Sequence, residues 1–137
     1  MRVLASWLHR FHGWTVTGQW HLRTTLGKQE YTDITLEKGG NPPIVLKLLA
    51  TGDPLFVRSH IEKTPEYMNL LSSNEGWVVH FTCEDNYDPV WQSDAELDKG
   101  VNVVHFAHDV AFTQVLMWAR WRNDTGSAEY NTGILDI

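Results

Sequence analysis

The sequence predicts a single α/β domain, residues 1–137, with a mixed central β-sheet flanked by helices. The motif VVHF occurs twice, at 78–81 and at 103–106, each time as a buried strand that follows a segment with helix-start signals. The run IVLKLLA at 44–50 is apolar on both faces, which is typical of a central strand. A chain of this length is also large enough to bury a core without disulfide bonds.

The N-terminal half is expected to contain a helix, three strands and a turn. Apolar residues at positions i, i+3, i+4 and i+7 predict a helix over 3–12, which a glycine ends. Even spacing of apolar residues predicts an extended segment over 14–26, and strict alternation predicts a half-buried strand over 31–37. The sequence GGNPP at 39–43 is typical of a turn, and it leads into the central strand at 44–50.

Two helix-start signals follow the central strand. Asp53-Pro54 combines an N-cap residue with a proline at the first helical position. Thr64-Pro65-Glu66 repeats this pattern, so we expect a second short helix from there to about Leu71.

The C-terminal half is expected to alternate strands with a short helix and to close with a hairpin. Ser93 is predicted to cap a helix over 94–99, which Gly100 ends. Strands are predicted at 77–81, 101–106, 112–122 and 130–135, with a turn at 123–126 before the last of them.

The repeated motif places two histidines at equivalent positions. Because both VVHF strands follow helical connections, we expect them to be parallel neighbours within one sheet. Side chains alternate along a strand, so Val78 shares a face with His80, and Val103 shares a face with His105. Pairing in register would bring the two histidine side chains next to each other.

Composition restricts the functional class. The net charge of −6 argues against broad binding to a phosphate backbone, which requires a dense Lys/Arg surface. The only cysteine, Cys83, excludes a disulfide within the chain and is typical of a reducing compartment, so we expect an intracellular protein, cytoplasmic or nuclear. The apolar run Val3–Leu8 is too short for a signal core or a membrane span, and we expect no membrane association.

Two short motifs could hold a metal. His80-x-x-Cys83 and His105-x-x-His108 contain four residues of the types that ligate Zn²⁺, and paired short spacings are typical of tetrahedral sites. Ligands three residues apart require the chain to turn between them, because a strand rises more than 3 Å per residue. The alternative is that His80 and His105 are buried and bonded to the backbone or to each other, with Cys83 a small core residue.

A further pattern resembles a nuclease family. Asp33 lies on a polar-faced strand, and a Gly-Pro turn then leads to the buried strand that carries Lys47. An aspartate on one strand of a hairpin, followed by a buried strand with an acid-x-lysine, resembles the core of the PD-(D/E)xK, or restriction-endonuclease-like, nucleases. The helix–strand–strand–strand–helix–strand order of that superfamily is also similar to the order predicted for residues 3–83. The resemblance implies two acids that hold Mg²⁺, while the metal and the lysine polarise a water for attack on phosphate.

Three longer stretches resemble a domain that recurs in predicted fungal proteins, some of them described as Crinkler-like. They are NPPIVLKLLATGDP, EGWVVHFTCEDNYDPVWQSD and GVNVVHFAHDVAFTQVLMWARW. Crinkler effectors can carry nuclease-like modules of this kind. The resemblance covers most of the chain from about residue 11.

The nuclease motif is degenerate in this chain. With Lys47 at the lysine position, the acid position holds Val45; with Lys47 at the acid position, the lysine position holds Leu49. Glu37 and Glu30 are the candidates for a relocated acid. Glu37 has the same strand parity as Asp33, so an active nuclease would use Asp33, Glu37 and Lys47. The alternative is a buried ion pair between Asp33 and Lys47, because an unpaired buried charge costs several kcal/mol.

Aromatic residues suggest an interaction surface. The chain has seven tryptophans, more than one small core usually needs, and exposed Trp and Tyr mark interfaces. The segment WARWR at 118–122 could stack on bases, form a protein interface or cover a core strand.

The function that these observations favour is recognition by a degenerate nuclease fold, through a protein partner or a second copy of the chain. One alternative is a Mg²⁺-dependent nuclease that acts on DNA or RNA. The other is an interaction module stabilised by Zn²⁺.

Overall fold

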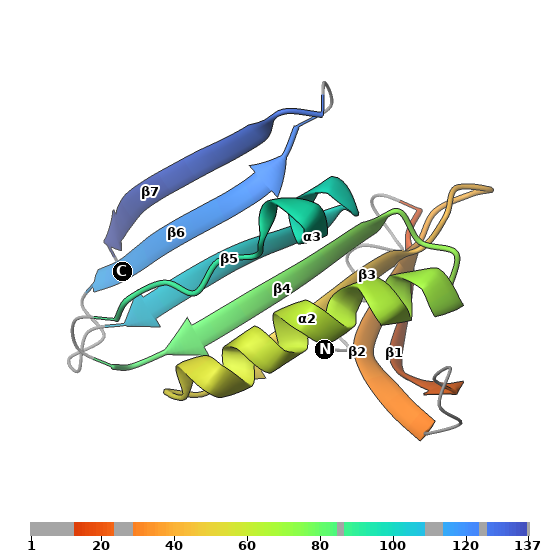
Figure 1. Ribbon diagram of the computed structural model, residues 1–137, viewed down its shortest axis with the longest axis horizontal. Coiled ribbons are helices and arrows are strands. Elements are labelled where there is room, and N and C mark those ends of the chain that lie inside the picture. Colours follow the sequence, from red (N-terminus) through yellow and green to blue (C-terminus); the bar gives the residue numbers. More distant parts are fainter. Residues whose placement is uncertain (1–12, 24–28, 85–86, 109–113, 124–125, 137) are drawn as a thin grey trace.

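The computed structural model describes residues 13–23, 29–84, 87–108, 114–123 and 126–136. These residues form one seven-stranded sheet whose strands lie side by side in chain order, from β1 to β7 (Figure 1). Both described helices, α2 and α3, lie in front of the sheet in that view. The predicted mixed α/β class is therefore confirmed, whereas the helix predicted over 3–12 falls outside the described residues.

The elements occur in the following order: β1 (Thr15–Arg23), β2 (Gln29–Glu37), β3 (Ile44–Ala50), α2 (Pro54–Leu70), β4 (Glu75–Thr82), α3 (Asp94–Asp98), β5 (Val101–His108), β6 (Gln114–Arg122) and β7 (Ala128–Asp136). The three central strands β3, β4 and β5 are parallel to one another, and every other neighbouring pair is antiparallel. The predicted C-terminal hairpin is the pair β6–β7.

The two VVHF motifs pair in register, as the sequence predicted. Val78 lies opposite Val103, and His80 lies opposite His105, in the parallel ladder of β4 and β5. All four side chains are fully buried, at 0% exposure. The repeat therefore builds the centre of the sheet and fixes a pair of histidines inside it.

Helix α2 runs without interruption through the proline at which a second helix was predicted to begin. That prediction is wrong, and the local chemistry explains why. Pro65 lacks an N–H, so it removes only one helical hydrogen bond, the one to the carbonyl of Ile61. The Thr64 hydroxyl donates to the carbonyl of His60 at 2.8 Å, and both Thr64 and Ile61 are buried. Packing of this turn thus keeps the helix continuous.

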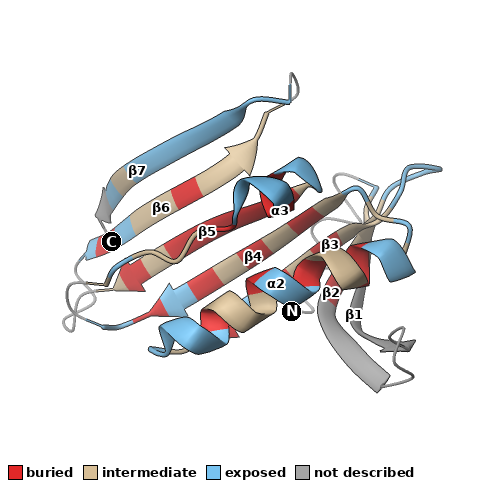
Figure 2. Ribbon diagram, viewed as in Figure 1, coloured by how far each residue is buried: buried red, intermediate tan, exposed pale blue. Residues whose placement is uncertain are grey.

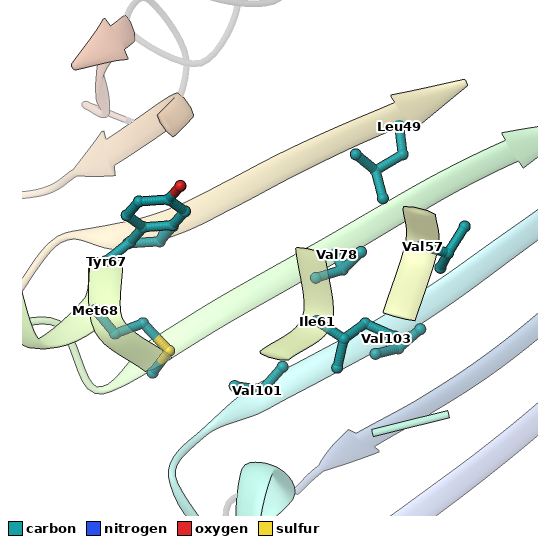
Figure 3. Packing of buried hydrophobic residues seen from close by; sticks show 9 residues of the cluster. Leu49, Val57, Ile61, Tyr67, Met68, Val78, Val101 and Val103 are labelled. Carbon is teal, nitrogen blue, oxygen red and sulfur yellow. The ribbon is translucent and has the colours of Figure 1, made fainter. Parts of the chain in front are cut away.

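The core lies between α2 and the strands β3, β4 and β5. Figure 3 shows apolar side chains of the helix, including Val57 and Ile61, against Val78 and Val103 of the strands. Val57 and Ile61 are both 0% exposed, so each contributes roughly 1.5–3 kcal/mol through burial alone. In Figure 2 the buried positions concentrate on β4, β5 and the inner side of α2.

Helix α3 is short and is held by its ends. Ser93 caps it with a capping box, in which Ser93 and Glu96 each accept a hydrogen bond from the other's backbone N–H. Glu96 also accepts a hydrogen bond of 2.7 Å from Arg58, which ties α3 to α2. Gly100 ends the helical region at φ 94°, and a Cβ there would meet the carbonyl oxygen of Asn74.

Strand β7 forms one edge of the sheet and is open to solvent. It pairs with β6 along its whole length, from Ala128 opposite Arg122 to Asp136 opposite Gln114. Tyr130 is 63% exposed and Ile134 is 61% exposed, which is high for large apolar side chains on a strand. Neither of the helices in the described part of the chain has the length and apolar character that a bilayer crossing requires.

Candidate functional site

The lysine of the sequence pattern that resembles a nuclease motif is buried. Lys47 lies on the face of β3 that packs against α2 and is only 2% exposed, between buried Val45 and Leu49 on the same face. Its Nζ lies 3.9 Å from the centre of the Tyr67 ring, a cation–π contact with the helix. The lysine that could polarise a water in an active nuclease is thus enclosed by the helix.

The two predicted acids, Asp33 and Glu37, lie at different distances from this lysine along the sheet. The ladder between β2 and β3 starts with Ile34 opposite Leu46, so Asp33 and Lys47 each come one residue beyond that pair. The side chain of Asp33 lies outside the described residues, and its pairing with Lys47 stays a prediction. Glu37 is four residue steps along the ladder from Lys47, roughly 13 Å. Glu37 therefore does not reach the lysine.

The histidine pair forms a fully buried polar cluster. The Nδ1 atoms of His80 and His105 lie 3.1 Å apart, and their ring centres are 5.2 Å apart. The Nε2–H of His80 donates to the carbonyl of Thr51 at 2.8 Å, and the Nε2–H of His105 donates to the carbonyl of Val90 at 2.7 Å. This arrangement confirms the expectation of buried histidines bonded to the backbone, and it places the two rings in contact.

Tyr87 completes the cluster from the loop that precedes α3. Its hydroxyl lies 3.2 Å from Nδ1 of His105, and its ring lies 5.2 Å and 5.4 Å from the rings of His80 and His105. Sequence reasoning missed this residue because the loop has no periodicity; the only signal was an aromatic residue between acids ahead of Pro89.

Burial governs the protonation of these rings. Desolvation lowers the pKa of His80, against an opposing effect of its bond to Thr51. The pKa of His105 is lowered to about 4, mainly by desolvation and in part by the neighbouring His80, against an opposing effect of its bond to Val90. Burial raises the pKa of Tyr87. The cluster is accordingly uncharged near neutral pH.

The other two predicted zinc ligands lie elsewhere. Strand β5 stays extended to His108, which lies three positions after His105 and therefore on the opposite face. Cys83 is exposed, just after the end of β4. Within the described ranges, no group of three or more His, Cys, Asp or Glu side chains is arranged to hold a metal ion. The structure therefore does not bring the four predicted ligands together.

Cys83 and His108 instead line a surface pocket of about 320 Å³ at the carboxyl ends of the parallel strands. Its wall also includes Thr51, whose carbonyl accepts the hydrogen bond from His80. In open α/β sheets, ligands commonly bind at this edge. The complete lining is Ala50, Thr51, Gly52, Phe81, Thr82, Cys83, Glu84 and His108.

The basic residues of the WARWR segment have structural partners. Arg120 forms an ion pair of 2.5 Å with Asp94 and donates to the carbonyl of Gln92. Arg122 forms an ion pair with Asp98. Both arginines thus fasten α3 to β6, which favours the interpretation that this segment covers the core over the interpretation that it stacks on bases.

Comparison of the chain with known protein families, with curated proteins and with solved structures finds no match.

Proposed function

We propose that this chain is a protein-recognition domain on a nuclease-like core that has lost the Mg²⁺-binding motif of the nucleases, and that its partner is a second copy of itself. The order β1–β2–β3–α2–β4 supports the nuclease-like core, since it is similar to the order expected from the resemblance. The burial of Lys47 beneath Tyr67 is the observation that carries the loss of catalysis. Val45, at the motif's acid position, is also fully buried and cannot bind a cation.

The open edge of the sheet supports self-association. An exposed edge strand presents unpaired N–H and C=O groups to another strand. Strand β7 has no proline, is nine residues long and carries exposed Tyr130 and Ile134 on one face. These two residues pair with Arg120 and Leu116 of β6, so they lie on the side of the sheet that carries the helices.

The sequence of β7 is complementary to itself in an antiparallel arrangement. With Thr132 on a twofold axis, Tyr130 of one copy would lie opposite Ile134 of the other. Aromatic and β-branched residues are favourable cross-strand neighbours. Glu129 would lie opposite a leucine and Asp136 opposite an alanine, so no acids would face each other. The result would be a continuous sheet across two copies.

Two measurements on the purified full chain test this function. Light scattering after gel filtration is expected to give the mass of a dimer, and Ile134→Lys is expected to give a monomer because two lysines would enter the apolar pairs. Leu55→Lys is the matched control, since Leu55 is 78% exposed on α2, and it should remain a dimer. A monomeric wild type, or a dimer that Ile134→Lys does not affect, would refute the β7 interface.

The second measurement concerns catalysis. Incubation with plasmid, single-stranded DNA and RNA in Mg²⁺ or Mn²⁺ is expected to leave all three substrates intact. Cleavage that Asp33→Ala abolishes would establish the active nuclease in place of the recognition domain. Cleavage that persists in Asp33→Ala and Lys47→Met variants would indicate a contaminating nuclease. The assay would then be repeated after a second purification.

A further inference from the structure

In the buried histidine cluster two ring nitrogen atoms face each other with no hydrogen between them. A neutral imidazole has one N–H, and both rings direct theirs from Nε2 to a backbone carbonyl. Both Nδ1 atoms are then acceptors, and they lie 3.1 Å apart. The hydroxyl of Tyr87 can donate one hydrogen, to His105. Two lone pairs directed at one small space are best satisfied by a cation between them.

The spacing of these atoms fits one particular kind of cation. Zn²⁺ binds histidine nitrogen at about 2.0 Å in tetrahedral sites, which places neighbouring ligand atoms about 3.3 Å apart. The two Nδ1 atoms are 3.1 Å apart, and Tyr87 Oη is 3.2 Å from Nδ1 of His105. Both distances come close to the edge of such a tetrahedron.

The surroundings of the rings are also those of metal ligands. A histidine that ligates a metal commonly donates its other N–H to a carboxylate or a backbone carbonyl, which fixes its tautomer and orientation. His80 does so to Thr51 and His105 does so to Val90. The pairing of β4 with β5 then holds both rings at a fixed register. The donors are thus oriented before any ion arrives.

We propose that Nδ1 of His80, Nδ1 of His105 and Oη of Tyr87 bind one Zn²⁺ ion, with the phenolic hydrogen of Tyr87 released to solvent as its oxygen becomes a ligand. Three protein ligands leave a fourth tetrahedral position for water or a small ligand. Tyr87 is half-buried and lies in the loop before α3, so it forms the part of the site closest to solvent. This site differs from the sequence-predicted one, because it excludes Cys83 and His108. It is also independent of self-association through β7.

Titration of the untagged, chelator-treated full chain with Zn²⁺ tests the site. We expect one equivalent to bind and to raise the melting temperature, and Co²⁺ to give the intense visible absorption of a tetrahedral complex. Long-range ¹H–¹⁵N spectra should show the Nδ1 resonances of His80 and His105 shifted while both Nε2 atoms keep their hydrogens. Tyr87→Phe should weaken Zn²⁺ affinity by about tenfold or more while leaving the circular dichroism unchanged.

Variants at the other predicted ligands provide the controls. Cys83→Ser and His108→Gln should bind Zn²⁺ like the wild type, and His105→Gln should lose binding where its circular dichroism shows a fold. Loss of binding in Cys83→Ser or His108→Gln would overturn the proposed site. Absence of Zn²⁺ binding in a folded wild type would also overturn the proposed site, because the two histidines would then share no more than a proton.

Discussion

The ammonium group of Lys47 lies 3.9 Å from the centre of the Tyr67 ring, in the interior between β3 and α2. A desolvated cation–π contact contributes about 2 kcal/mol or more. Tyr67→Leu removes both the ring and part of the core volume, so we expect a loss of roughly 3–5 kcal/mol in the free energy of unfolding. Urea denaturation followed by circular dichroism measures this loss.

The matched control for that prediction is Tyr67→Phe, which keeps the aromatic face over Lys47. Its cost should be at least 1 kcal/mol smaller than that of Tyr67→Leu. Equal losses in the free energy of unfolding for Tyr67→Leu and Tyr67→Phe would mean that the aromatic ring stabilises the protein only by filling volume.

The buried histidines predict acid lability of the metal-free protein. Burial lowers the pKa of His80 below its usual value and that of His105 to about 4, whereas both titrate near 6.5 in the unfolded chain. The unfolded chain therefore binds protons first as the pH falls, and stability present above about pH 6.5 is lost progressively toward pH 4. The loss from His105 is on the order of 3 kcal/mol.

Denaturation in urea at pH values from about 7.5 to about 4, with chelator present, measures this slope. The double variant His80→Gln/His105→Gln should show a shallower slope over the same range. An equally steep slope in that variant would assign the acid lability to other groups.

Gln92 predicts a second stability effect, at the junction of β5 and β6. It is 2% exposed, and its Nε2 donates to the carbonyls of Val101 at 2.9 Å and of Arg120 at 3.0 Å. Gln92→Leu keeps the volume but leaves two carbonyls without this donor, at a cost of roughly 2–4 kcal/mol. Thermal unfolding measures the effect, and Gln114→Leu, on the exposed start of β6, is the control with little expected change.

Gly100 predicts a backbone effect. Its φ of 94° disfavours any side chain, and an added Cβ would meet the backbone oxygen of Asn74. We expect Gly100→Ala to destabilise the protein by roughly 1–3 kcal/mol. Gly40→Ala is the control, since an added Cβ there meets nothing within 4 Å. Comparable melting temperatures for the two variants would contradict the close approach.

The sequence predicted the histidine register because two identical motifs on neighbouring parallel strands leave few alternatives. Side chains alternate between the two faces along a strand, so pairing in register places both rings on the same face. Tyr87 was missed for the converse reason, since loop residues follow no period and their positions depend on contacts made elsewhere. The zinc motif failed to assemble because β5 extends as far as His108, and an extended chain separates residues three apart onto opposite faces.

The helix start that was predicted at Thr64 shows a second limit of prediction from sequence. Cap signals report which residues can begin a helix, and they do not report whether an existing helix must stop. One missing N–H at Pro65 was outweighed by burial of the turn and by the hydroxyl bond of Thr64. Tertiary packing decided this position, and local pattern alone could not reveal it.

The strands of this sheet lie in space in the same order as in the chain. Each strand emerging from a ribosome would find its docking edge already supplied by the strand synthesised before it. Assembly could therefore advance across the sheet in one direction, without threading any strand between two earlier ones. Among these seven strands, the last edge to form would be that of β7.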